Sequence, residues 1–115
     1  MDKEIADKQI KQRTCIFCKN KYFQEDLIRI FFFQNTPYLA FKKSVINVYT
    51  EQIVKDKKEV LRKKSRSFYF CLDCWKKQKE NYKVKQIKYN LNKIKNVSVD
   101  LLPFLQKINK LITWL

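Results

Sequence analysis

Short runs of apolar and aromatic residues occupy the middle of the chain. The longest covers residues 27–33 (LIRIFFF) and is interrupted only by Arg29. Ile and Phe favour the extended conformation, so this run predicts a strand. Residues 35–37 (NTP) have the composition of a turn, which would bring residues 38–41 back as the second arm of a hairpin.

Two further segments are rich in β-branched and aromatic side chains. Residues 45–49 (VINVY) and 67–70 (SFYF) each predict a strand. The pattern between them is ambiguous, and residues 50–61 are compatible with a short helix. Together these segments indicate a small antiparallel sheet built from hairpins.

The last third of the chain has the three- and four-residue spacing of apolar positions that is typical of amphipathic helices. Residues 75–95 contain neither Pro nor Gly, and their apolar face consists of Val84, Ile87, Leu91 and Ile94. Residues 98–115 repeat the pattern with Leu101, Leu102, Leu105, Ile108, Leu111 and Ile112. Ser98 or Asp100 is the natural N-cap of this second helix, and Pro103 then falls within the first turn, where its missing N–H has no helical partner to lose.

These elements predict an α+β fold, a small antiparallel sheet with C-terminal helices. At 115 residues and 45% hydrophobic composition the chain suits one globular domain. We divide it into a polar N-terminal arm (1–12), a basic domain (13–95) and an amphipathic helix (96–115) that packs on the domain or on a partner. The chain has no Gly, so backbone positions with positive φ are expected at asparagines: Asn20, Asn35, Asn81, Asn90 and Asn96.

The charge of the chain calls for an anionic partner. It carries 26 Lys and Arg against 11 Asp and Glu, a formal net charge of +15. Such a density favours a phosphate array or an anionic membrane surface, because each displaced counterion adds favourable entropy. RNA, DNA or a ribosome is the leading expectation.

The N-terminal residues 1–13 (MDKEIADKQIKQR) lack the apolar segment of a secretion signal, and their acids do not fit a mitochondrial presequence. No window approaches the length of a membrane span. We therefore expect a cytoplasmic protein with no membrane partner.

The four cysteines form two C-x-x-C pairs, Cys15/Cys18 and Cys71/Cys74, separated by 52 residues. Each pair can present two thiolates on one side of a turn, and two such knuckles complete a tetrahedral site for Zn²⁺. In a reducing compartment this shared zinc site is the favoured interpretation. The segment between the pairs is longer than in a zinc ribbon and must itself be folded.

Two other interpretations of the cysteines stay open. A thioredoxin-like redox motif would need a C-x-x-C at a helix start in a βαβ context, which neither pair has. Alternatively, the thiols are ordinary buried side chains. The chain also has no His, which removes the Ser-His-Asp and Cys-His arrangements, and no feature indicates an enzyme or a small-molecule substrate.

Two lysine-rich stretches are candidate contacts for nucleic acid. Residues 55–66 carry a net charge of +5 and residues 76–95 a net charge of +7. Aromatic residues lie beside the first stretch, and an exposed aromatic ring next to cations is typical of surfaces that stack RNA bases. The candidates are Phe68, Tyr69 and Trp75; we weigh equally a Tyr69 that is exposed and one that belongs to the core.

Three motifs in order resemble the YlxR family of small bacterial proteins. They are RTCIFC at residues 13–18, LIR at 27–29 and SRSFYFC at 65–71, the last preceding a Lys-rich helix. The family pattern reads R-x-C-[IV]-x-C, then L-I-R, then G-R-G-x-Y-x-C. Here Ser65 and Ser67 replace both glycines, which would weaken any close backbone approach to a phosphate.

The resemblance implies a small α+β RNA-binding protein, proposed in some members to modulate ribonuclease P through its RNA. We therefore expect a non-catalytic regulator that binds structured or single-stranded RNA, such as ribonuclease P RNA or rRNA. The alternative is a lineage-specific zinc-containing ribosomal protein. The metal ligands would be Cys15, Cys18, Cys71 and Cys74, and the RNA contacts Arg13, Arg29, Arg62, Lys63, Lys64, Arg66, Tyr69, Lys76 and Lys77.

Overall fold

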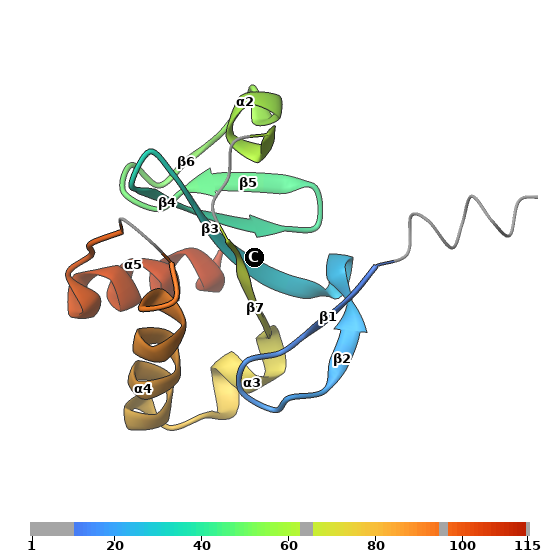
Figure 1. The fold of residues 1–115 in the computed structure, drawn as a ribbon, viewed down its shortest axis with the longest axis vertical. Coiled ribbons are helices and arrows are strands. Elements are labelled where there is room, and N and C mark those ends of the chain that lie inside the picture. The colour runs from blue at the N-terminus through green and yellow to red at the C-terminus, as the bar shows by residue number, and fades with distance from the viewer. Residues whose placement is uncertain (1–10, 63–65, 95–96, 115) are drawn as a thin grey trace, which may run out of the picture.

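Two antiparallel sheets and a set of helices make up the chain (Figure 1). The computed structural model describes residues 11–62, 66–94 and 97–114. The elements follow the order β1 (Gln12–Thr14), β2 (Lys21–Phe23), the 3-10 turn η1 (Gln24–Asp26), β3 (Leu27–Phe33), β4 (Thr36–Phe41), β5 (Ser44–Asn47), β6 (Gln52–Ile53), α2 (Lys57–Arg62), β7 (Phe68–Cys71), α3 (Leu72–Lys77), α4 (Glu80–Leu91) and α5 (Leu101–Thr113). The predicted α+β class is confirmed.

The larger sheet has the strand order β6-β5-β4-β3-β7, and every neighbouring pair in it is antiparallel. The predicted strand over residues 27–33 is correct, but its hairpin partner begins earlier than expected. Phe33 pairs with Thr36, so the turn consists of Gln34 and Asn35 alone. Both have positive φ, 52° and 62°, which matches the right-handed twist of the two strands.

Most residues with positive φ are not asparagines, because the position of a residue in a tight turn decides its φ. Of the four expected asparagines that the structure describes, Asn35 alone has it, and Asn96 lies outside the described residues. The remaining positions are Lys19, Gln34, Lys42 and Glu51. In a chain without Gly, each tight turn places whatever residue it holds in this less favourable region, at a cost of about 1 kcal/mol each.

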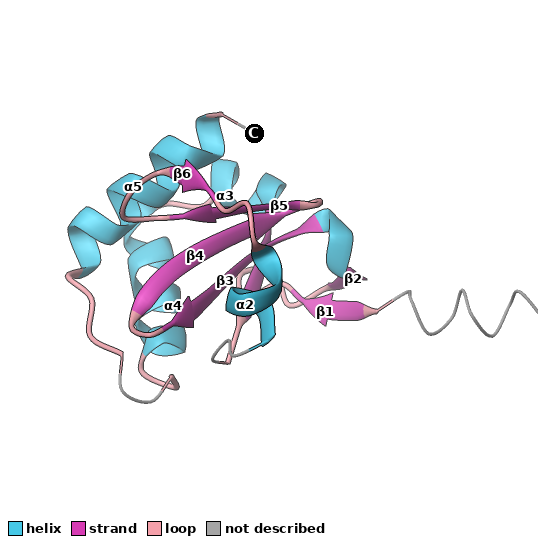
Figure 2. Cartoon of the chain, turned by 90° about the horizontal axis from the view of Figure 1, so that it is seen from above, coloured by secondary structure: helices cyan, strands magenta, loops and turns pink. Residues whose placement is uncertain are grey.

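The two faces of the larger sheet are covered differently. On one face, Ile30 and Leu39 join residues of α4 and α5 in the main core. On the opposite face, Phe31 and Tyr38 pack against Val60 of α2 in a smaller cluster. Figure 2 shows α3, α4 and α5 on one side of the sheet and α2 on the other. Because six helical residues span about 9 Å, α2 covers only part of its face.

The predicted single helix over residues 75–95 is wrong, because the chain breaks it. Helix α3 ends at Lys77, and Gln78 and Lys79 are extended, with ψ of 147° and 150°, before α4 begins. Neither is Pro or Gly, so no local signal marks the break. The bend turns α4 so that Ile87 and Leu91 lie in the core.

Helix α5 packs its apolar face on the same core. Asp100 is its N-cap and Pro103 lies in its first turn, as the sequence predicts. Its buried residues are Phe104, Leu105, Ile108, Leu111 and Ile112. The ring of Phe104 stacks on Phe32 of β3, with centroids 6.2 Å apart, and so ties the helix to the sheet.

Truncating the buried face of α5 should destabilise the protein. Leu105 is 4% exposed, whereas Leu102, which the sequence pattern also assigned to the apolar face, lies in the first turn of the same helix and is 63% exposed. We expect Leu105→Ala to lower the free energy of unfolding by about 2 to 5 kcal/mol in urea denaturation, through lost burial and a residual cavity. The matched control Leu102→Ala should change it by less than about 0.5 kcal/mol. Equal effects of the two substitutions would contradict this packing.

Candidate metal centre and basic face

The first C-x-x-C pair lies in the tight connection between β1 and β2. These strands form a small hairpin in which Thr14 pairs with Lys21. The amide of Cys15 donates to the Asn20 carbonyl at 3.0 Å, and the amide of Lys19 donates to the Cys15 carbonyl at 3.0 Å. Lys19, just after the second cysteine, has a φ of 65°. The backbone therefore folds back on itself and brings the two thiols to the same side.

The second pair lies where β7 becomes α3. Cys71 is both the last residue of β7 and the N-cap of α3, and Cys74 lies in the first turn of that helix. The helical turn sets the two thiols on one side of the backbone, as residues three apart do. A strand-to-helix junction thus supplies the second half of the site.

Backbone pairing joins the two halves. Cys15 forms an isolated parallel bridge with Tyr69 at the free edge of β7. The amide of Ile16 donates to the Tyr69 carbonyl at 2.9 Å, and the amide of Cys71 donates to Cys15 Sγ at 3.4 Å. The first knuckle is therefore held against the strand that leads into the second.

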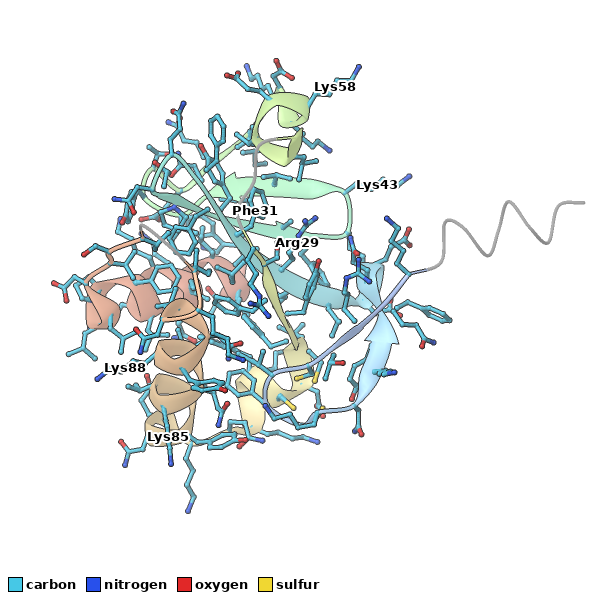
Figure 3. The ribbon with its side chains drawn as sticks, in the orientation of Figure 1. Arg29, Phe31, Lys43, Lys58, Lys85 and Lys88 are labelled. Atoms are coloured by element: carbon cyan, nitrogen blue, oxygen red, sulfur yellow. The ribbon has the colours of Figure 1, made fainter. Side chains whose placement is uncertain are left out.

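The four thiols converge in one cluster. All four Sγ atoms lie within 4.8 Å of one another, and Cys15 Sγ and Cys71 Sγ are 3.8 Å apart. Two thiolates bound tetrahedrally at the usual Zn–S length would be separated by about 3.8 Å. All four cysteines are free thiols, and Figure 3 shows their sulfur atoms, in yellow, gathered beside the junction of β7 and α3. The residues predicted as ligands could therefore hold a metal ion.

The environments of the thiols differ. Burial raises the pKa of Cys15 and of Cys74. Burial acts in the same direction on Cys18, but hydrogen bonds, the largest with the Tyr22 hydroxyl, outweigh it and lower its pKa to about 7. The same hydrogen bond, with Cys18 Sγ and Tyr22 Oη 3.4 Å apart, raises the pKa of Tyr22 to about 12.

No known family model, curated protein or solved structure matches this chain. In the described part of the chain, no helix combines the length and apolarity needed to cross a membrane.

A cluster of basic and aromatic side chains lies next to the cysteines, on the sheet face that α2 partly covers. Arg29 of β3 pairs with Tyr69 of β7, so both side chains lie on that face. The guanidinium carbons of Arg29 and Arg13 are each 5.8 Å from the centre of the Tyr69 ring. Arg29 Nε also donates to the Ser67 hydroxyl at 3.1 Å. The ring and the hydroxyl thus hold the two arginines in place.

Arg29 is half-buried and remains a cation. Burial lowers its pKa from the ordinary value, Tyr69 opposes this effect and Arg13 adds to it, but an arginine stays protonated through such changes. Among the described residues, no carboxylate lies within ion-pair distance of its guanidinium. A partly desolvated cation with no acidic partner is ready to bind an anion.

A hollow of about 340 Å³ opens over Arg29. Its lining includes Lys42 and Lys43 from the β4–β5 turn, Lys57 from α2 and a single acid, Glu25. Lys42 Nζ also lies 3.3 Å from Asp26, in an exposed ion pair. Figure 3 shows Arg29 near the centre of the sheet, Lys43 extending outward from the β4–β5 turn and Lys58 extending outward from α2. We call Arg13, Arg29, Lys42, Lys43 and Lys57 the basic face.

The structure separates the other predicted RNA contacts from this face. Arg66 is exposed and lines a second hollow with Asn90 and Lys93. Lys76 lines a third hollow beside α5, and Lys77 pairs with Asp73 at 3.2 Å. Arg62 is the last residue of α2, and Lys63 and Lys64 lie outside the described residues.

The aromatic residues proposed for base stacking lie in the core. Tyr69 is only 9% exposed, and Phe68 and Trp75 are buried as well. All four residues of β7 are buried because the sheet core covers one side of the strand and the basic face and first knuckle cover the other. Tyr69 positions Arg13 and Arg29 and offers no open ring face for a base.

Sequence reasoning missed the lysines of the hollow. Lys42 and Lys43 stand in a two-residue hairpin turn between Phe41 and Ser44. A Lys-Lys pair between two predicted strands is visible in the sequence, but the sheet face it approaches depends on strand register. Lys57 lies within the basic stretch of residues 55–66, where no sequence feature distinguishes it from the neighbouring lysines.

Protein purified without chelator should contain one metal ion per chain, bound by all four thiols. We expect Cys18→Ser and Cys74→Ser each to lower the bound metal, measured by inductively coupled plasma mass spectrometry, and to lower the melting temperature. Chelation of the wild type should lower it similarly, whereas Thr14→Ser, beside Cys15 but without a thiol change, should leave both quantities unchanged. Metal-free protein whose stability is insensitive to these substitutions would show that the thiols are only core side chains.

Proposed function

We propose that this protein is a non-catalytic RNA-binding protein whose fold is stabilised by zinc. The observation that carries the proposal is the basic face, where the half-buried Arg29 and three lysines line one hollow. RNA phosphates match this arrangement. A guanidinium binds the oxygens of one phosphate through two parallel hydrogen bonds, and the surrounding lysines can neutralise the neighbouring phosphates of the RNA.

Zinc is the metal that the donor set favours. Four thiolates in a tetrahedral arrangement are typical of structural zinc sites, which leave no open position for a substrate. Backbone amides support the sulfurs, since Phe17 and Cys71 each donate to Cys15 Sγ at 3.4 Å. The ion would stabilise the fold and the position of Arg13, two residues before Cys15, without taking part in a reaction.

The YlxR resemblance supports the same function. Its motifs contain Arg13, Arg29 and Tyr69, which are far apart in sequence and come together in the basic face. On this basis we propose a regulator of RNA metabolism in a reducing compartment, with ribonuclease P RNA as a candidate target.

A ribosomal protein that binds rRNA permanently is the second candidate, favoured by the net charge of +15. Co-sedimentation with ribosomes that survives high salt would support this candidate, because contacts made mainly to phosphates weaken steeply with salt.

The basic face can be tested by the salt dependence of RNA binding. If about five phosphates are neutralised, a plot of the logarithm of the association constant against the logarithm of the salt concentration should have a slope of roughly −3.5 to −4.5. The double variant Lys43→Gln/Lys57→Gln removes two cations from the hollow. We expect it to weaken binding to all RNAs and to reduce the steepness of the slope by about 1.4 to 1.8 units, measured by fluorescence anisotropy.

The matched control is Lys76→Gln/Lys77→Gln on α3, which removes the same charge outside the basic face. Its slope should remain close to that of the wild type. Equal losses in the two double variants would show that binding follows total charge and not this face. A wild-type protein with no salt-dependent affinity for RNA would overturn the proposed function.

A further inference from the structure

Tyr89 is an exposed aromatic ring on the lysine-rich side of α4. Its exposed fraction is 57%, in contrast to the buried Tyr69. The ammonium of Lys93, which follows the C-terminal end of α4, lies 4.3 Å from the centre of the ring. An exposed ring beside a cation is the combination that binds unpaired bases, because every base has a π face and each carries a phosphate nearby.

The surroundings of the ring also suit a nucleotide. A hollow of about 460 Å³ is lined by Lys19 of the first knuckle and, from α4 and the residue after it, by Lys85, Gln86, Lys88, Tyr89 and Asn92. None of these residues is acidic. Figure 3 shows Lys85 and Lys88 extending from α4 into solvent. The lysines can reach phosphates, and the two amides can donate to or accept from a base edge.

This hollow is connected to the basic face by a chain of contacts. Lys93, whose ammonium lies over the Tyr89 ring, lines a second, smaller hollow of about 170 Å³. Arg66, Ser67 and Tyr69 line the same smaller hollow. Ser67 in turn accepts the hydrogen bond from Arg29. Cationic and polar groups thus continue from Arg29, around the free edge of β7, to Tyr89.

We propose that Tyr89 stacks on an unpaired base of a single-stranded RNA segment that continues onto the basic face. The inference rests on the proposed function and extends it, because it assigns single-stranded RNA as the substrate class. The ring supplies stacking, and Lys85 and Lys88 neutralise the adjoining phosphates. A regular duplex gains nothing from the ring, since its bases are already stacked on one another.

The test compares the binding of a short fluorescein-labelled single-stranded RNA with that of a duplex of the same length, each over the same series of salt concentrations. Tyr89→Ala should weaken single-strand binding about 5- to 140-fold, the range expected for one lost base stack, and leave duplex binding unchanged. Tyr89→Phe and Tyr89→Trp should retain most of the affinity, while Tyr89→Leu, apolar but not aromatic, should lose it. The salt slope of Tyr89→Ala should equal that of the wild type, because no charge is removed.

The matched control is Tyr49→Ala, at a tyrosine that is 45% exposed and whose carbonyl accepts a hydrogen bond from Lys107 of α5. It should bind both RNAs like the wild type. Ala favours the helix more than Tyr does, so Tyr89→Ala should fold, and circular dichroism checks this.

The outcomes separate the two proposals. Salt-dependent binding by the wild type with equal single-strand affinity for Tyr89→Ala would overturn the stacking site and leave the proposed function standing. An equal loss for the duplex would also overturn it. A wild type that binds neither RNA would overturn both.

Discussion

The meeting of the two C-x-x-C pairs is the constraint on which the rest of the structure depends. Cys15 and Cys71 are 56 positions apart in sequence, yet their sulfurs are separated by 3.8 Å. Closing a loop of this length costs conformational entropy, which the folded sheet between the pairs offsets and which a shared metal ion would offset further. The loop closure also brings the first knuckle to the edge of β7, where Cys15 bridges Tyr69. The position of Arg13 follows from that pairing.

The basic face is a consequence of this arrangement and of a sheet covered unequally. Helices α4 and α5 supply the main core on one side, while α2 shields only part of the other. Collecting cations on the open side costs repulsion, and Tyr69 reduces that cost by placing a π face beside both Arg13 and Arg29. A net charge of +15 on so small a chain adds to the repulsion. Binding a polyanion would relieve this repulsion. The excess positive charge that destabilises the isolated protein would therefore stabilise a complex with a polyanion.

Local sequence patterns predicted the elements better than their boundaries. The run LIRIFFF became β3 as expected, because Ile and Phe prefer extended backbone in any sheet. The helix expected over residues 75–95 was split at Gln78 and Lys79, since α3 is fixed by the cysteines at its start while α4 must turn to bury Ile87. The turn at Gln34 and Asn35 was misplaced for a similar reason: the pairing of Phe33 with Thr36 decided it.

The sequence by itself determined the α+β class, the four potential metal ligands and the excess of positive charge, because composition, short-range periodicity and C-x-x-C spacing are local properties. Only the tertiary structure decided which basic residues share a face and which tyrosine is exposed. Arg29 and Lys43 meet over one hollow, whereas Lys76 lines another, and Tyr69 is buried while Tyr89 is not. Strand register and helix packing fix these outcomes, and a shift of one residue in a strand would move every side chain to the opposite face.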